Sequence, residues 1–555
     1  MPVLKPGRRL MAPAYERETA PVLNFHRLQT PPGDGDVLIE PPFAQWPGLI
    51  SGNIRRRKGW SFTLAGEPVA SAVGQTRGAL VQGDDRVVVA SGHQPAFVHP
   101  GVWAKHVVLN RAAGSLAAAC VDFVVDNDSP RSTALTVPVV GPEGLVGLEA
   151  IPFQVSASPA GSAYEGRPAL TGEQIQAIRR ALRRALGDRY EASLLPTYLD
   201  HLGARPPTLK NDRPEAGPTR VWEWTGSADG RVQDAVAQHL AGREAVDRLL
   251  EAALPEVRVS DAFGGPFLAE LLLNPEPFAA AYNQALSRYR REQAVRGPDR
   301  PLPDLRRYED RMETALWVYQ PLGPRRRLWV RRAGERIDLF ADSRPVGDVS
   351  AQALARAPDE TLAALRPWVI RPRALTLTLW ARLLVCDLFV HGIGGAKYDR
   401  ITDEIIRRYF GCEPPAYACV TATLRLPLPK FGTTPETVRA ARRRLRDWRY
   451  NPQRYLHQPP SDLIEERWEL IARADRLREA LGPGPLRREV YQAIREVNAR
   501  LAESEPGRGA DLAAEARRIE RELESDTVAS SREFFYCLQP PDRLRRLTTR
   551  LHEEG

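Results

Sequence analysis

Cysteine and long apolar runs are both scarce in this chain. The five cysteines are spread over 555 residues without a Cys-x-x-Cys pair, so neither a disulfide framework nor a structural zinc site is expected. No apolar run reaches the length of about 18 residues that a membrane-spanning helix needs. The segment Met1–Glu16 has arginines and prolines in place of the apolar stretch of a secretory signal. We therefore expect no membrane partner and a cytoplasmic location.

Lysine is also rare, because only six of the 78 basic residues are lysines. The net charge of +9 comes mainly from arginines that are distributed along the chain rather than gathered in one tail. The run Arg442–Tyr450 mixes arginines with aromatic residues, a composition that can bind phosphates and stack on bases. The same run is typical of a solvent-facing helix side that uses Trp448 as an anchor. Nucleic-acid binding therefore remains an alternative, but nucleic acid is not the partner that we expect.

The length and the composition together predict a globular protein with several structural units. Hydrophobic residues make up 43% of the chain and charged residues 26%, as in ordinary folded proteins. A chain of this length is longer than a single hydrophobic core accommodates. The expected units are an N-terminal lead-in (1–85), the first half of a core (86–160), a mostly helical insertion with a β-hairpin (161–345), the second half of the core (346–435) and a C-terminal helical region (436–555).

The first half of the core has the pattern of a strand, a helix and a second strand. The β-branched run Arg86–Gly92 predicts a buried strand, and the segment His93–Gly101, with its two prolines, predicts a loop. Residues Trp103–Leu116 have helical periodicity, and Val121–Val125 predicts the next buried strand. This order predicts a βαβ unit and hence an α/β fold with a parallel sheet.

The same alternation returns in the second half of the core. An apolar helix is expected over Thr376–Cys386 and a strand over Leu388–Val390. A glycine-rich turn follows at His391–Gly395, and then a helix over Lys397–Phe410 that Gly411 ends. This half is expected to complete the same sheet.

Two hairpins are predicted outside the core. The segment Leu328–Phe340 predicts a β-hairpin that turns at Ala333-Gly334. In the C-terminal region, apolar residues recur every three or four positions over 486–501 and again over 512–523, on either side of the turn Glu505–Gly509. This pattern predicts an antiparallel helical hairpin that packs on itself, on the body or on a second copy of the chain.

Chemistry-bearing residues cluster where the predicted strands end. Ligands of parallel sheets bind beyond the carboxyl ends of the strands, and helix N-termini there offer N–H groups to anions. The first stretch is expected to bind phosphate through Gly92, Gln94 and Lys105, while His93 and His99 bind or protonate it. The structural alternative is that the histidines cap the loop and the prolines shape it.

Two further stretches are expected to reach the same edge of the sheet. Asp126 and Asp128 follow the second strand and suit Mg²⁺, an amine or sugar hydroxyls, although an Asx-type turn before Pro130 explains them as well. The third stretch has glycines, which let the backbone approach a ligand, and it also has a lysine at the start of a helix. Its candidate ligand-binding residues are His391, Gly392, Gly394, Gly395 and Lys397.

The motifs resemble those of the BshC-type family, putative cysteine ligases of bacillithiol biosynthesis. Gly92-His-Gln-Pro-Ala96 with Lys105 is similar to that family's first loop and helix, Asp126-Asn-Asp128 to its acidic stretch, and Val390–Gly395 to its later glycine loop. The loop His93–Pro100 is also similar to the opening loop of WbqC-like proteins. The resemblance implies a Rossmann-like core with helical insertions and a C-terminal coiled coil that forms a dimer.

The resemblance also implies a function. Related Rossmann transferases bind ATP phosphates at a histidine-bearing loop, so we expect a nucleotide-assisted ligase or transferase that uses ATP or ADP with Mg²⁺ and acts on a small molecule. The loop has His93 and Ala96 where the family has glutamine and glycine, and the substrate therefore stays open. A non-catalytic scaffold on the same fold is the other alternative.

Overall fold

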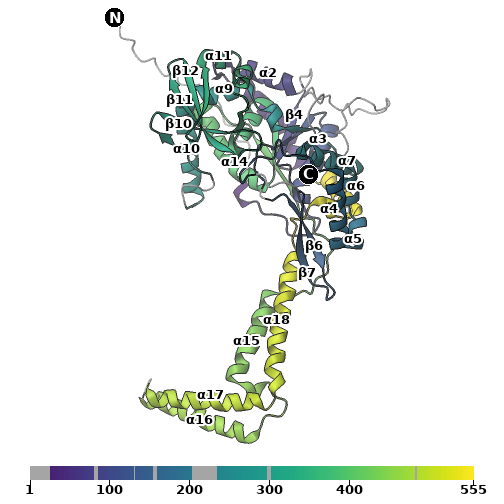
Figure 1. Cartoon of the computed structure of the whole chain (residues 1–555), viewed down its shortest axis with the longest axis vertical. Coiled ribbons are helices and arrows are strands. Elements are labelled where there is room, and N and C mark those ends of the chain that lie inside the picture. The colour runs from purple at the N-terminus through teal and green to yellow at the C-terminus, as the bar shows by residue number, and fades with distance from the viewer. Residues whose placement is uncertain are drawn as a thin grey trace.

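A computed structural model describes residues 25–80, 86–130, 132–153, 159–202, 234–296, 302–481 and 484–554. The protein is a mixed α/β molecule with a broad body and a long helical arm (Figure 1). Parts of the predicted lead-in, residues 1–24 and 81–85, lie outside the described residues. Within the described residues, no helix is both long enough and apolar enough to cross a membrane.

The core of the body is a six-stranded sheet in which five strands run parallel. The edge strand β1 pairs antiparallel with β16. From β4 the chain adds β5 and then β8 on one side. It then returns and adds β15 and β16 on the other side of β4. The direction in which strands are added therefore reverses between β4 and β15. In spatial order the strands are β1 (Val37–Glu40), β16 (Tyr417–Ala422), β15 (Leu388–His391), β4 (Val88–His93), β5 (Ala119–Val124) and β8 (Glu256–Arg258).

Both faces of this sheet are buried, which explains the nearly continuous apolar sequence of its central strands. Val89 and Val390 face a core that includes α3 (Pro100–Ser115), α1 (Trp46–Lys58) and α19 (Pro541–Glu553). Ala90 and Phe389 face the opposite core, which includes α14 (Ile393–Ile405) and α2 (Val69–Leu80). The predicted strand–helix–strand unit is confirmed, and its helix begins three residues earlier than expected, at Pro100.

A second, antiparallel sheet lies beside the first. Its order is β13 (Arg344–Ser350), β12 (Arg336–Ala341), β11 (Arg326–Ala333), β10 (Arg311–Tyr319) and β14 (Val369–Pro372), with β9 (Arg307–Tyr308) paired to β10. The predicted hairpin is confirmed as β11–β12. The rest of the sheet was not predicted, and the expected boundary at residue 345 falls inside β13. A hairpin alone is marginally stable, and the additional strands supply the surface that buries its apolar face.

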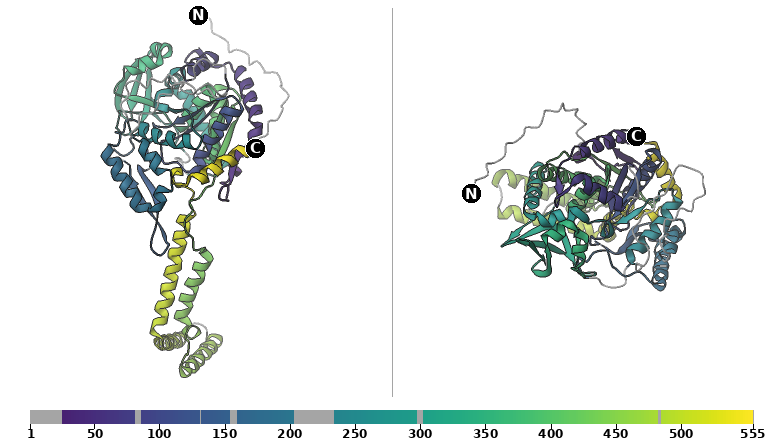
Figure 2. Two further views of the ribbon diagram at one scale, coloured as in Figure 1. Left: turned by 90° about the vertical axis from the view of Figure 1, so that its right-hand side faces the viewer. Right: turned by 90° about the horizontal axis from the view of Figure 1, so that it is seen from above.

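The C-terminal helices form an arm that projects from the body (Figures 1 and 2). It contains α15 (Pro435–Tyr450), α16 (Ser461–Leu481), α17 (Pro485–Glu503) and α18 (Pro506–Ala529). The predicted hairpin of α17 with α18 is wrong. Ala516 and Ile519 of α18 pack against α15, whereas Val497 and Leu501 of α17 pack against α16. The periodicity identified the apolar side of each helix correctly but not the helix that covers it.

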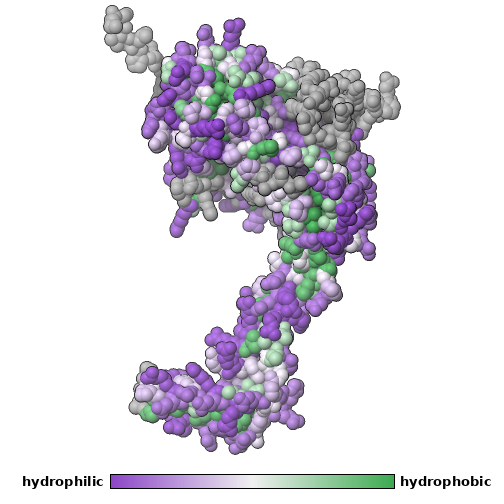
Figure 3. Space-filling model, viewed as in Figure 1, coloured by the Kyte–Doolittle hydropathy of each residue, from purple (hydrophilic) through white to green (hydrophobic). Residues whose placement is uncertain are grey.

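The basic run of α15 takes part in this packing. Arg442 Nε lies 2.5 Å from Glu520 and Arg444 Nη2 lies 2.5 Å from Glu515, both across the α15–α18 contact. Hydrophilic side chains cover much of the arm and the body in the view of Figure 3. The two ion pairs between α15 and α18 favour the interpretation of the basic run as a helix face that stabilises the arm.

Gly101 lies where α3 approaches the end of β16. A Cβ at this position would lie 2.5 Å from the carbonyl oxygen of Ala422 and 2.8 Å from Thr421 Oγ1. Because a backbone oxygen cannot move aside freely, Gly101→Ala should lower the free energy of unfolding by about 2 kcal/mol in urea denaturation. Gly114→Ala in the same helix, where a Cβ meets nothing within 4 Å, is the control. Equal stability of the two variants would contradict this packing.

Candidate functional site

The carboxyl ends of β4 and β15 lie side by side where the strand succession reverses. Val390 of β15 pairs with Ser91 of β4, and His93 pairs with Val124 of β5. Gly92, His93 and His391 therefore occupy neighbouring positions at one edge of the sheet. The structure thus brings the first and third predicted stretches together, at the position where open α/β sheets bind ligands.

Lys105 lies behind the first loop. Its ammonium donates a hydrogen bond to the carbonyl oxygen of Gly92 at 2.8 Å, and the residue is 2% exposed. Burial lowers the pKa of Lys105, and the carboxylate of Asp122 partly offsets this effect. A desolvated ammonium with one neutral partner retains donors for an anion.

His93 is a neutral imidazole with a defined tautomer. Its Nδ1 lies 2.8 Å from the carbonyl oxygen of Gln94, and because a carbonyl only accepts, Nδ1 carries the proton and Nε2 keeps its lone pair. Burial, followed by the charge of Lys105, lowers the pKa of His93 to about 3. At neutral pH the side chain therefore provides a hydrogen-bond acceptor rather than a positive charge.

A second lysine approaches the same edge from the opposite face of the sheet. Burial, followed by the charge of Glu40, raises the pKa of the Cys419 thiol to about 12, while Lys105 and Lys397 both act to lower it. Since Cys419 pairs with His391 on the neighbouring strand, both lysines lie near the end of β15. The edge therefore has two cations, one from α3 and one from α14, and one carboxylate, that of Glu40, which pairs with Cys419 on the other side.

The glycine-rich segment is the start of a helix and not a turn, which corrects the expectation. Gly392 is the N-cap of α14, and Gly394 and Gly395 lie exposed in its first turn. A Cβ on Gly394 would meet nothing within 4 Å, whereas one on Gly395 would lie 2.8 Å from His391 Nδ1. The N–H groups of this turn have no carbonyl partner within the helix, so they suit an anion at the sheet edge.

The side chain of His391 is buried against α14 and forms part of an ionic cluster. Its Nε2 lies 3.0 Å from Asp399 Oδ2, and Asp399 also accepts a hydrogen bond from Arg382. Burial raises the pKa of Asp399, but Arg382 and His391 outweigh it and hold that pKa below its usual range. His391 therefore fixes the start of α14 against the sheet.

The two predicted aspartates are held by protein donors. Asp126 is fully buried and accepts from Arg258 Nε at 2.8 Å and from both the backbone N–H and the hydroxyl of Ser260. Asp128 accepts from the amide of Gln94 and lies 2.7 Å from Arg325. A metal ion would have to displace these donors, so neither aspartate is free to serve as a metal ligand.

His99 caps a helix, which agrees with the structural alternative for the loop histidines. It is the N-cap of α3, and its Nδ1 accepts from the N–H of Gly101 at 3.1 Å. Burial lowers the pKa of His99 to about 4, although Glu533, at 3.4 Å from Nε2, acts in the opposite direction. His99 orders the helix start and lies six residues beyond the strand end.

A buried polar centre behind Lys105 was not predicted. Asp122 accepts from Ser91, and His106 lies 3.3 Å from both Asp122 and Asp247. Arg243 Nη2 lies 3.0 Å from His106 Nε2, and the charges of Asp122 and Arg243 both act on the pKa of His93. One signal was present in the sequence, because Asp122 is a carboxylate inside an otherwise apolar strand.

Part of this centre has the composition of a metal site. Ligand atoms of His106, Asp122 and Glu256 lie within 4.8 Å of one another. The guanidinium of Arg243, however, lies 3.0 Å from both His106 and Glu256. Because this cation already pairs with Glu256 and contacts His106, the centre is a buried ionic network.

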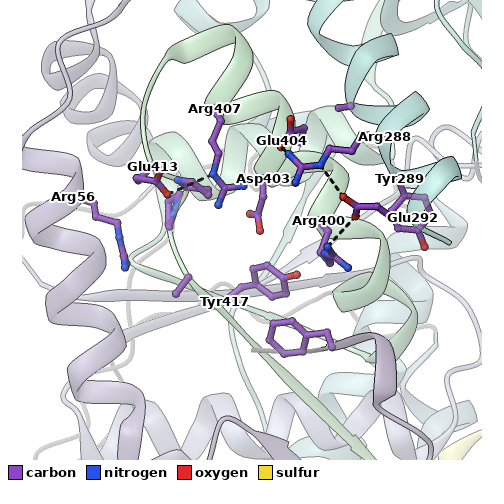
Figure 4. Close-up of a pocket in the computed structure, with 15 residues that line it drawn as sticks. Arg56, Arg288, Tyr289, Glu292, Arg400, Asp403, Glu404, Arg407, Glu413 and Tyr417 are labelled. Carbon is purple, nitrogen blue, oxygen red and sulfur yellow. Dashed lines mark hydrogen bonds and ion pairs between the residues drawn. The ribbon is translucent and has the colours of Figure 1, made fainter. Parts of the chain in front are cut away.

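Two cavities flank the sheet, and neither is lined by His93, Asp126 or the 391–395 segment. The smaller, of about 80 Å³, lies against the loop residues Pro95, Ala96 and Phe97. His239 borders it, with Nε2 at 3.1 Å from the Ala96 carbonyl oxygen and Nδ1 at 2.7 Å from the Tyr198 hydroxyl. The larger lies near the amino end of β16 (Figure 4).

Comparisons with known proteins do not assign the chain to a family. No protein-family model matches it, and no curated protein matches it. The resemblance to the BshC-type family therefore depends on the short motifs at residues 92–96, 126–128 and 390–395.

Proposed function

We propose that the core is Rossmann-like and that the protein is a nucleotide-assisted ligase or transferase that binds phosphate at the carboxyl edge of β4 and β15. The strand succession β8-β5-β4-β15-β16, with its reversal between β4 and β15, supports the fold. One observation supports the site above all others. Strands β4 and β15 end side by side at this reversal, where the ammonium of Lys105 lies 2.8 Å from the carbonyl oxygen of Gly92 and α14 begins with Lys397 in its first two turns.

Each group at the edge has a role in this proposal. Lys397 and the first turn of α14 bind the phosphates, and Lys105 neutralises charge from behind the Gly92 carbonyl. His93 offers Nε2 to a proton of the acceptor substrate. A bound phosphate would counter the charge of Lys105, one of the causes of the low pKa of His93, and so would make the imidazole a better base.

The residues fit the phosphates of ATP or ADP better than they fit a protein-bound metal. Open space next to Gly394 gives an anion access to the helix start. Asp126 and Asp128 are already paired with Arg258 and Arg325. Mg²⁺ would therefore enter with the nucleotide, where it supplies charge neutralisation between phosphate oxygens.

Calorimetric titration with ATP and ADP in the presence of Mg²⁺ tests this proposal. The native chain should bind, and Lys397→Ala should weaken binding by about tenfold, the loss of one charge-assisted contact. Lys58→Ala removes an exposed lysine at the end of α1 and should leave binding unchanged. Absence of binding, or equal weakening by both substitutions, would refute the assignment.

A non-catalytic scaffold is the second candidate, and one observation favours it. The polar groups of the edge satisfy one another, since Lys105 bonds Gly92, His93 bonds Gln94 and Gln94 bonds Asp128. A scaffold needs no free donors and would bind no nucleotide. The same titration therefore separates the two functions.

A further inference from the structure

The larger cavity, of about 390 Å³, lies at the amino edge of the central sheet, opposite the proposed phosphate site. Its walls come from α1, α10 (Pro275–Glu292), α14 with the π-helical turn Ile406–Phe410, and the loop before β16 (Figure 4). A cavity of this size can enclose a small ligand, and π-helical turns are frequent at functional sites. None of the predicted site residues lines this cavity.

Arginine and carboxylate side chains alternate around the cavity, and on one side they neutralise one another. Glu292 lies 2.8 Å from Arg288 and 3.1 Å from Arg400. Glu404 lies 2.9 Å from Arg288 and 2.7 Å from Arg408. Three guanidiniums share two carboxylates on this side, so each of these five groups already has an ion-pair partner.

The other side is incompletely paired. Arg56 donates from Nη1 to the amide oxygen of Asn53 at 2.9 Å and forms no ion pair among the described residues. Arg407 Nε lies 3.5 Å from Glu413, whose side chain is 73% exposed. Both guanidiniums line the cavity, so each has N–H donors to spare for a carboxylate, which guanidinium binds in a bidentate manner.

Carboxylate oxygens are also available on this side. Asp403 points into the hollow between Arg407 and Arg400 (Figure 4), and its Oδ1 lies 2.6 Å from the buried guanidinium of Arg382. Glu413 stands beside Arg407, and among the described residues the 3.5 Å contact with Arg407 is its only ion pair. A ligand in this position therefore meets both signs of charge.

An apolar floor completes the cavity. The rings of Phe25 and Tyr417 stack with centroids 4.7 Å apart, and both residues line the cavity together with Pro414 and Pro415. Tyr417 lies below the charged side chains in Figure 4. This arrangement suits a small molecule with a charged end and an apolar end.

We propose that this cavity binds a free α-amino acid with an apolar side chain. The ligand's carboxylate would bind Arg56 and Arg407, its ammonium would bind Asp403 and Glu413, and its side chain would pack on Tyr417 and Phe25. A polyanion such as a nucleotide is disfavoured, because Asp403 and Glu413 would repel it. The site is separate from the proposed phosphate site and does not depend on it.

Titrations with L-leucine, L-methionine and L-phenylalanine test the ligand class. At least one should bind with a Kd below about 1 mM. The N-acetyl derivative of that amino acid lacks the ammonium, and its amide lacks the carboxylate, so both should bind at least about tenfold more weakly. No binding by any of the three, or equal binding of the N-acetyl derivative, would overturn the proposal, and the latter result would indicate a simple anion site.

Substitutions locate the site. Arg407→Gln and Arg56→Gln should each weaken amino acid binding by about tenfold or more, with the same thermal unfolding midpoint as the native chain. Arg55→Gln makes the same chemical change one position earlier on α1, at an exposed residue that does not line the cavity, and should bind normally. Native affinity in both cavity variants would place the ligand elsewhere and overturn the assignment.

Discussion

Arg382→Met should lower the free energy of unfolding by about 4 kcal/mol in urea denaturation, because it leaves two carboxylates inside the protein without their cation. The guanidinium of Arg382 is 1% exposed and contacts Asp399, Asp403 and the carbonyl oxygen of Pro415. Methionine fills much of the same volume, so the loss measures mainly the unpaired charges. The same substitution should loosen the start of α14, since Asp399 also holds His391.

Arg408→Met is the matched control for this effect. Arg408 lies in the π-helical turn Ile406–Phe410 at the end of α14, is 37% exposed and pairs with Glu404 at the surface. An exposed pair contributes about 0–1 kcal/mol, so the control should unfold almost as the native protein does. A loss below about 1 kcal/mol for Arg382→Met would show that the buried pairs can rearrange around the missing charge.

The second large effect is a pH-dependent contribution of His106. Burial and the charge of Arg243, whose Nη2 lies 3.0 Å from Nε2, lower the pKa of this imidazole, but the carboxylates of Asp122 and Asp247 outweigh both and raise it to about 9. A group whose folded pKa exceeds its ordinary value of 6.5 stabilises the fold fully below pH 6.5 and loses that contribution as the pH rises through 9. The contribution at low pH is about 3 kcal/mol.

His106→Gln therefore should be least stable relative to the native chain at pH 6, and the difference should shrink toward pH 9.5. Urea denaturation at several pH values measures it. Val107→Ala, at the adjacent buried position of α3, should cost about 2 kcal/mol at every pH, since it removes methyl groups and no charge. A difference for His106→Gln that is constant across this range would contradict a charged His106 in the folded protein.

The sequence predicted the central strands well because their signal is local. The apolar runs of β4, β5 and β15 each end at a polar or glycine residue, and the parallel sheet follows from their alternation with helices. The strands β1 and β8 are short, and β8 contains Glu256 and Arg258. Such strands are defined by pairing with distant segments, which a local pattern does not show.

The contacts of the candidate site were likewise predictable only where the residues are close in sequence. Gly92 and Lys105 meet because strand, loop and helix are consecutive, and this contact could be expected. Asp126 is bonded to Arg258, which is 132 positions away in the sequence, and no spacing rule gives that partner. The network around Asp122 and Arg243 likewise joins the first half of the core to α7 (Ala235–Leu249), inside the predicted insertion, so its members were visible singly but not as a group.

The central claim is that a nucleotide binds where β4 and β15 end. Hydrogen–deuterium exchange of the native chain, with and without ATP and Mg²⁺, tests the location directly. We predict slower exchange in peptides that contain residues 92–99 and 391–399, and unchanged exchange in the arm and in the segment 407–417. Protection of only the arm or the segment 407–417, or no protection at saturating ATP, would contradict the claim.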